Sequence, residues 1–204
     1  MAAYVNNTVQ RHKIADYLNV SATEIASYAL LGTGFTSLNE SPNAQVKSTK
    51  YINNPSATKT TTSYETQFPF NSELIASEAV IMKIYNMATL QKTGGDCETE
   101  YIRVDLFTPK YTKTTDIALD SGKTYYTVTD GIYTAVAAPD VADIGDYYEA
   151  STTDFHARKF PVSIEVSSID DSDGNMQISG NLNQAGLMVE GYFNISTKAF
   201  TANT

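Results

Sequence analysis

The sequence has few of the residues on which redox, metal and base-catalysed chemistry usually depend. It contains one cysteine, Cys97, and no tryptophan. One cysteine excludes an intramolecular disulfide, and its surroundings lack the paired spacing of a zinc site or redox motif. The two histidines, His12 and His156, are far apart in the chain. A lone thiol of this kind suits a reducing compartment.

Positive charge and long apolar runs are also scarce. Lysine and arginine total 14 against 23 acidic residues, which gives a net charge of −9. A negative net charge disfavours binding to the phosphate backbone of nucleic acid, which is also negative. Charged side chains interrupt the N-terminal residues, unlike a signal peptide, and no later stretch could span a bilayer. We therefore expect a soluble protein that is not secreted by the standard route.

The residues that are present favour β-structure. Tyrosine occurs 14 times, and threonine is abundant among β-branched neighbours, a composition typical of strands. The clearest alternation of apolar and polar residues runs from 160 to 167, and turns at 170–174 and 183–186 separate it from further strands near 176–182, 189–195 and 200. The apolar members of the first run are Phe160, Val162, Ile164 and Val166. An antiparallel meander is the economical topology.

Three more strand regions precede this run. Residues 27–39 are expected to form a strand pair or one bent strand, and residues 58–70 a threonine-rich strand. Residues 101–107 alternate, with Ile102, Val104 and Leu106 separated by Arg103 and Asp105, which predicts a half-buried strand.

One convincing helix is predicted, over residues 72–92. Asn71 is a suitable N-cap and Gly94 a suitable stop. Val80, Ile84 and Met87 form one stripe of a wide apolar face, which we expect to pack on a sheet. A second, short helix is predicted over residues 8–18. The fold class is therefore mainly β, an antiparallel β-sandwich or barrel with one flanking α-helix.

Two segments depart from this regular pattern. Residues 40–57 are predicted to be a loop, longer than compact domains usually keep without a use. Residues 111–153 contain six tyrosines, a Thr129-Asp130-Gly131 hairpin signal, and two lysines against seven acidic residues. We interpret 111–153 as a surface insertion whose removal the fold should tolerate.

No motif for catalysis, a cofactor or a metal is found. Asp171, Asp173 and Gly174 resemble the middle of a calcium loop, but Ile169 and Gly180 occupy two of its ligand positions, so an ordinary turn is expected. Neither histidine adjoins a G-x-S-x-G or similar nucleophile motif. We expect no catalytic residues, no cofactor and no metal, and therefore no enzyme.

Several segments, taken in order, resemble one known family. They are RHKIADYLNV, GTGFTSLNESPNAQVKSTKYINN, SATKTTTSYETQFPF, SELIASEAV and ARKFPVSIEVSSIDDSDGNMQISGNL. Together they are similar to the major tail tube protein of phages that infect Gram-positive bacteria. The resemblance covers nearly the whole chain except residues 111–153.

The resemblance implies a single tail tube domain over residues 1–204. Six copies would form a ring in which the inner sheets join into one β-barrel, and rings would stack into a tube. The implied partners are further copies of the chain, the tape measure protein, and tail terminator or baseplate proteins. DNA would be only a transient cargo, and no membrane is involved. The implied location is the virion tail, assembled in the host bacterial cytoplasm.

Within that framework, residues 40–63 are predicted to carry inter-ring stacking. They hold Lys47, Lys50 and Lys59 against one acid, a net +2 that leaves −11 for the rest of the chain. A basic loop reaching an acidic neighbour would give the stack a direction. Tyr51 and Ile52 would be its apolar anchor.

The sequence is also compatible with three other functions. The inner tube of a contractile tail or of a phage-derived bacteriocin would share the fold. A glycan-binding β-sandwich, using the tyrosine-rich 111–153 segment as its contact surface, is a different class of function. An enzyme is the last alternative.

Overall fold

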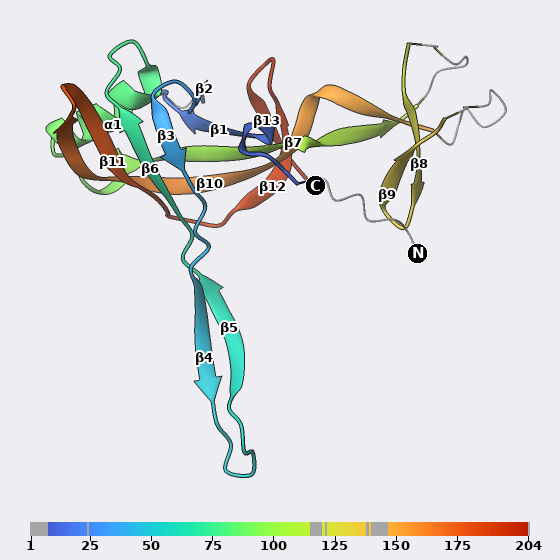
Figure 1. Cartoon of the computed structure of the whole chain (residues 1–204), viewed down its shortest axis with the longest axis horizontal. Helices are drawn as coiled ribbons and strands as arrows, with labels where there is room; N and C mark the ends of the chain where they lie inside the picture. The colour runs from blue at the N-terminus through green and yellow to red at the C-terminus, as the bar shows by residue number, and fades with distance from the viewer. Residues whose placement is uncertain are drawn as a thin grey trace. The chain divides into compact units, whose positions relative to one another are not determined.

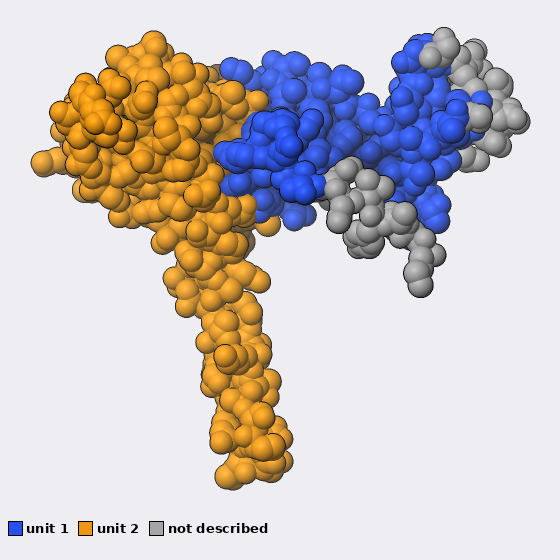
Figure 2. All heavy atoms as spheres, in the orientation of Figure 1, with its two compact units in different colours: residues 1–15, 103–158, 190–204 blue, residues 16–102, 159–189 orange. Residues whose placement is uncertain are grey.

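The computed structural model describes residues 8–203 except 24, 115–119, 121, 138 and 140–146. The chain divides into two compact units (Figure 2). Unit 1 comprises residues 1–15, 103–158 and 190–204, and unit 2 comprises residues 16–102 and 159–189. Four acids of the predicted 111–153 insertion, at positions 116, 140, 143 and 146, lie outside the described residues.

The described residues form thirteen strands and one α-helix (Figure 1). The helix is α1 (Ala79–Thr89), and two 3-10 turns lie at Arg11–Lys13 and Gly94–Cys97. The strands are β1 (Ile14–Asn19), β2 (Tyr28–Leu30), β3 (Phe35–Leu38), β4 (Ala44–Thr49), β5 (Thr58–Tyr64), β6 (Gln67–Glu73), β7 (Glu98–Lys113), β8 (Tyr125–Thr129), β9 (Ile132–Ala135), β10 (Tyr148–Ser172), β11 (Asn175–Gln184), β12 (Val189–Asn194) and β13 (Ala199–Ala202).

Most strands belong to one sheet. Its main path runs β2-β1-β7-β10-β11-β6-β3, with β12 and β8 also paired to β10, β13 to β12, and β9 to β8. Strands β4 and β5 form a separate two-stranded sheet. The pairs β1–β2, β10–β11, β11–β6 and β3–β6 are antiparallel. The predicted class, mainly β and antiparallel with one α-helix, is thus confirmed.

Helix α1 covers the apolar core of unit 2. Val80, Ile81, Ile84 and Met87 are buried and share one cluster with residues of β6, β10 and β11. These four positions recur every three or four residues, so they lie on one face of the helix. The predicted stripe therefore faces the core, widened by Ile81.

The helix is shorter at both ends than the sequence suggests. Ser72, expected in its first turn, lies in β6, where it is aligned with Ile178 of β11. The helix starts after Glu78 and ends at Thr89, and Gln91 has a φ of 49°. Gly94 opens a 3-10 turn instead of ending the helix. Residues 71 and 72 pair with β11 on one side and with β3 on the other. This strand pairing outweighs the local signal for a helix N-cap at Asn71.

The helix predicted over residues 8–18 is wrong. Only the 3-10 turn Arg11–Lys13 precedes strand β1. Asp16, Tyr17 and Leu18 are all buried. Three consecutive buried side chains need cover on both faces of the backbone. A central strand provides that cover, whereas one surface helix does not.

The strand predicted over 101–107 is confirmed within β7, but its half-buried character is wrong. Tyr101, Ile102, Arg103 and Val104 are all buried, with Arg103 only 6% exposed. The alternation in the sequence placed Arg103 on a solvent face. Structure on both sides of the sheet buries that face as well.

The predicted hairpin at residues 129–131 is confirmed. Asp130 and Gly131 have φ values of 51° and 76°, and Asp173 and Gly174 in the turn after β10 have 53° and 83°. Positive φ at both central residues is the signature of a two-residue hairpin turn, which favours Asp-Gly. The calcium-like segment is therefore a hairpin turn.

Truncation of Ile84 tests the helix face. Ile84 is fully buried in the core of unit 2. We expect Ile84→Ala to lower the free energy of unfolding by about 2–5 kcal/mol, because the surrounding side chains cannot fill the cavity. Leu90→Ala is the control, since Leu90 is 66% exposed at the end of the helix. Urea denaturation measures the free energy of unfolding of both variants. Equal values for Ile84→Ala and Leu90→Ala would contradict this assignment.

Candidate functional site

The segment predicted to be a loop at 40–57 is mostly a β-hairpin, so that prediction is wrong for its first half. Strands β4 and β5 pair antiparallel from Ala44↔Tyr64 to Thr49↔Thr58, with a bulge after Gln45. Only residues 50–57 form the connecting loop. The prolines at 42 and 55 lie outside the paired strands, where the missing N–H of proline costs no ladder bond.

The hairpin has no apolar cover. Every residue of β5 and all but the last of β4 are exposed. Figure 2 shows residues 44–64 as a narrow arm that extends from the body of unit 2. Its exposed apolar side chains are Val46 (54%), Tyr51 (59%), Ile52 (109%) and Tyr64 (62%). An isolated two-stranded hairpin is only marginally stable in water, so an arm of this kind suits contact with another surface.

Hydrogen bonds between Asn43 and Glu65 hold the base of the arm. The backbone N–H of Glu65 donates to the carbonyl of Asn43, and the Asn43 side chain donates back to the Glu65 carbonyl at 3.1 Å. Asn43 adopts a φ of 46°, which asparagine tolerates better than most residues. An isolated bridge pairs Ser41 with Gln67 of β6. The arm thus starts from a fixed point on unit 2.

The structure brings the five predicted assembly residues onto this one arm. Lys47 lies opposite Thr60, and Lys59 lies opposite Ser48. Because side chains alternate along a strand, Lys47 and Lys59 point to opposite faces of the hairpin. Lys50, Tyr51 and Ile52 follow β4 in the connecting loop. The helix residues Val80, Ile84 and Met87 belong instead to the core.

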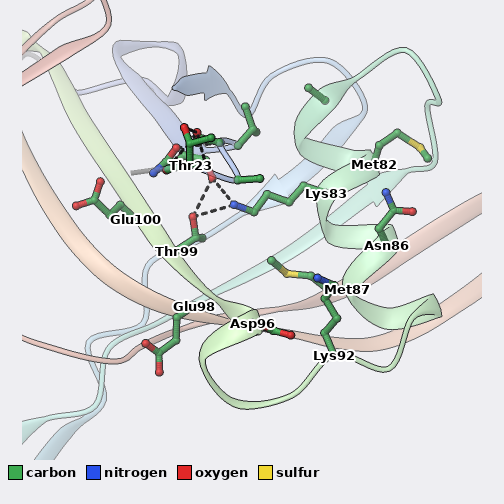
Figure 3. A pocket seen from close by; sticks show the side chains of 15 residues that line it. Thr23, Met82, Lys83, Asn86, Met87, Lys92, Asp96, Glu98, Thr99 and Glu100 are labelled. Atoms are coloured by element: carbon green, nitrogen blue, oxygen red, sulfur yellow. Dashed lines mark hydrogen bonds between the residues drawn. The ribbon is translucent and has the colours of Figure 1, made fainter. Parts of the chain in front are cut away.

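A second feature, missed from the sequence, is a pocket of about 660 Å³ beside helix α1 (Figure 3). Its walls come from residues 19–23, from one side of α1, and from residues 92–100. The charged residues of the lining are Lys83, Lys92, Asp96, Glu98 and Glu100. No pattern in the sequence links these segments, because β-pairing and helix packing bring them together.

Lys83 is the central side chain of this pocket. Its Nζ donates to the Asn19 carbonyl at 2.7 Å and to Thr99 Oγ1 at 3.1 Å, and Thr99 Oγ1 donates to the same carbonyl at 2.8 Å (Figure 3). Burial lowers the pKa of the Lys83 ammonium, and the nearby charge of Lys92 lowers it further. The contacts tie α1 to β1 and β7, so the role of Lys83 is structural.

A glutamate on the pocket wall belongs to a second polar network. Glu100 accepts hydrogen bonds from Tyr28 Oη at 2.5 Å and from Lys159 Nζ at 2.8 Å. Burial raises the pKa of the Glu100 carboxyl, but these hydrogen bonds and the Lys159 charge outweigh it, so the pKa lies below its usual value. Burial and the bond to Glu100 raise the pKa of Tyr28. The network stabilises an ionised carboxylate between strands.

The histidine and cysteine positions offer little chemistry. His156 Nδ1 lies 3.4 Å from Asp105 Oδ2, and its ring meets the Tyr192 ring edge-on at 6.5 Å. Cys97 is buried, and its thiol donates to the Lys92 carbonyl at 3.1 Å. Over the described part of the chain, no three His, Cys, Asp or Glu side chains are grouped to hold a metal ion. Among the same residues, no helix is long and apolar enough to cross a membrane.

The structural role of Lys83 can be tested by Lys83→Met. We expect the loss of its hydrogen bonds to lower the free energy of unfolding by about 1–3 kcal/mol. The folded protein also binds fewer protons than the unfolded chain just below pH 10.5, the ordinary pKa of this group. Wild-type stability therefore gains a contribution as the pH rises towards 10.5, which the variant lacks.

Urea unfolding across this pH range measures both effects. Lys59→Met is the control, because Lys59 lies on the exposed arm. Identical pH dependence in the wild type and Lys83→Met would contradict the assignment.

Comparison with known proteins gives little further information. No protein-family model matches the sequence, and no curated protein matches it. Among solved structures, one match is a chain of the cryo-EM structure of the anti-feeding prophage (AFP) baseplate. It is 6% identical, the alignment covers 93% of this chain and 97% of that chain, and the TM-score is 0.43. A likeness this weak establishes neither a shared fold nor a shared function.

Proposed function

We propose that this chain is a structural subunit of a phage tail tube. Copies would form rings, expected to be hexameric, that stack into a hollow tube for DNA, in the virion tail and without catalysis. Two observations support the proposal. One is the ordered resemblance to tail tube proteins over most of the sequence. The other, which carries it, is the uncovered β4–β5 arm with its basic and apolar side chains.

The composition of the arm suits a directional contact. Residues 40–63 carry a net +2 and the remaining residues −11. Attraction between the arm of one copy and the acidic body of the next is heterologous, so it would propagate a stack in one direction. Tyr51 and Ile52, 59% and 109% exposed, would gain most from burial. The charges would steer association, and the apolar pair would slow dissociation.

The sheet offers edges that a ring would use. The main path ends in two short strands, β2 and β3. Open edges invite pairing with another chain, and closure into a barrel removes them. If each of six copies gave about four strands at ~4.8 Å spacing and ~45° tilt, the barrel would be ~50 Å across. That width leaves room for a DNA duplex after side chains are placed.

Electron microscopy tests the proposal directly. We expect negative-stain images of the purified protein, taken at rising concentration, to show rings and then tubes. A protein that stays monomeric at every concentration would contradict it.

The role of the arm is tested by reversing its charge. We expect the double variant Lys47→Glu/Lys50→Glu to remain folded, because both side chains are exposed, and to slow or abolish tube growth. Raised salt should slow growth of the wild type by screening the same attraction. Light scattering measures growth, and circular dichroism measures folding.

A matched control separates the arm from total charge. Lys13→Glu/Lys198→Glu changes the net charge by the same amount at two exposed positions of unit 1. We expect this control to grow tubes faster than the arm variant. Wild-type growth by the arm variant at low salt would exclude an electrostatic role of the arm in stacking.

A further inference from the structure

Four tyrosine rings of unit 1 contact one another, and two of them are stacked. This tyrosine cluster consists of Tyr111 of β7, Tyr126 of β8, Tyr133 of β9 and Tyr148 of β10. The ring centroids of Tyr111 and Tyr133 are 3.8 Å apart, with an interplanar angle of 5°. Tyr126 meets Tyr111 edge-on at 5.1 Å, and Tyr148 meets Tyr133 edge-on at 5.4 Å. No ligand fits between the two stacked rings, so the chemistry of the pair is that of one ring with the other.

The strand register holds these rings on one face of the sheet. Tyr126 is aligned with Tyr148, and Tyr133 is aligned with Val128, two residues from Tyr126. Aligned residues, and residues two apart on a strand, share a face of the sheet. Strand pairing therefore fixes the position of Tyr133, and Tyr111 reaches it from β7.

The Tyr111–Tyr133 pair is closer than most aromatic pairs in proteins. Ring centroids are usually about 4.5–7 Å apart, and offset or edge-on arrangements are preferred to parallel stacking. With nearly parallel planes and centroids 3.8 Å apart, these two rings overlap, and their planes are at most 3.8 Å apart. This is close to the ~3–3.5 Å from which positioned atoms react. Each ring has two carbons ortho to its hydroxyl, so a small slide brings an ortho carbon of one ring against an ortho carbon of the other.

Both stacked rings are accessible to a dissolved oxidant. Tyr111 and Tyr133 are half-buried, so part of each side chain faces solvent. The neighbouring pair Tyr125 and Tyr147 is only 1% and 3% exposed and is therefore shielded. Burial, and then the neighbouring phenols of Tyr126 and Tyr133, raise the pKa of Tyr111. The Tyr111 hydroxyl is therefore protonated at neutral pH, and its oxidation has to release that proton to water.

We propose that Tyr111 and Tyr133 form an oxidative crosslinking site, at which a one-electron oxidant joins the two rings as dityrosine. Two equivalents of the oxidant, of the class of a peroxidase's oxidised haem, each accept one electron. Each phenol releases its hydroxyl proton to water and becomes a phenoxyl radical. The two radicals couple through a C–C bond between ortho carbons, and the hydrogen on each joined carbon moves to the oxygen of its own ring. Two electrons and two protons leave in total, and both hydroxyls are restored.

This bond would tie the β8–β9 hairpin to β7. Among the described residues, β9 pairs only with β8, and β8 joins β10 at two aligned positions. A covalent link from Tyr133 to Tyr111 closes the chain between them into a loop, which restricts the unfolded chain as a disulfide does. With one cysteine, the chain has no disulfide of its own. The inference is independent of tube formation, because both tyrosines belong to one chain.

Oxidation of the full-length protein in dilute solution tests the proposal. The oxidant is tris(bipyridine)ruthenium(III), generated by light and persulfate. Dityrosine fluorescence follows the reaction, and no tryptophan obscures it. Trypsin, which cuts after lysine and arginine, then places Tyr111 in peptide 111–113 and Tyr133 in peptide 124–158. We expect mass spectrometry to find these two peptides joined, with a mass lower than their sum by two hydrogen atoms.

Phenylalanine substitutions locate the bond, because they keep each ring and remove only the hydroxyl that is oxidised. We expect Tyr111→Phe and Tyr133→Phe each to lower the yield of the joined peptides by more than about tenfold, because the remaining radical has no stacked partner. Tyr126→Phe is the matched control. Tyr126 lies in the same peptide as Tyr133 and also contacts Tyr111, but edge-on, so this variant should crosslink as the wild type does. Circular dichroism establishes that each variant is folded.

Several results would overturn the proposal. One is the absence of dityrosine from the oxidised wild type. Another is dityrosine only between chains, seen as dimers on a denaturing gel, which would assign the reaction to exposed tyrosines such as Tyr51 and Tyr64 of the arm. A wild-type yield of the joined peptides in Tyr133→Phe, or their loss in Tyr126→Phe, would place the bond at another ring. Oxidation in urea is the last comparison, because an equal yield from the unfolded chain would show that the stacked geometry has no part in the reaction.

Discussion

The packing of three aromatic rings, one each from β6, β7 and β10, is the contact on which the fold of unit 2 depends. Phe68 of β6 is fully buried, 4.5 Å from the ring of Tyr101 in β7 and 4.9 Å from Phe160 in β10. A strand shifted by one residue would turn its ring to the other face of the sheet. These rings therefore fix which side of β6, β7 and β10 faces helix α1.

The same strand register requires a glycine at position 180 of β11. Gly180 of β11 lies opposite Val166 and Phe70. A Cβ at this position would lie 2.0 Å from the Glu165 carbonyl oxygen and 3.0 Å from the Phe70 ring. Only glycine permits so close an approach of β10 and β11. The long β10–β11 pairing and the burial of Phe70 thus depend on the absence of one side chain.

The β4–β5 arm, unlike the body of unit 2, has no buried core. Its backbone bonds are local, but its side chains have no core, so its contribution to the stability of one chain is small. The apolar cluster of unit 2, which helix α1 covers, contains no residue of the arm. The exposed side chain of Ile52 and the lysines of the arm are the features on which the proposed stacking role rests.

The hydrogen-bond networks of Lys83 and Glu100 could not be predicted from the sequence. Lys83 bonds to Asn19 and Thr99, and Glu100 to Tyr28 and Lys159. Each pair is far apart in the sequence, and none belongs to a motif. The tyrosines of residues 111–153 are an intermediate case. Their abundance is visible in the sequence, but the contacts among the rings of Tyr111, Tyr126, Tyr133 and Tyr148 are not.

The sequence by itself determined the features that depend on local pattern. Alternation identified the strands from Phe160 onwards, the Asp-Gly pairs identified two hairpin turns, and helical spacing identified the buried face of α1. Local pattern failed where both faces of a strand are covered, as at Asp16–Leu18 and Arg103. It also failed at residues 72 and 73, which were predicted to start the helix but pair as part of β6. It predicted one strand over 58–70, where the structure has β5 and β6, and it missed β4 and the β4–β5 pairing, because the polar residues of β4 carry no alternation of burial. Only tertiary structure decides these, because burial and hydrogen bonding there are set by segments distant in the chain.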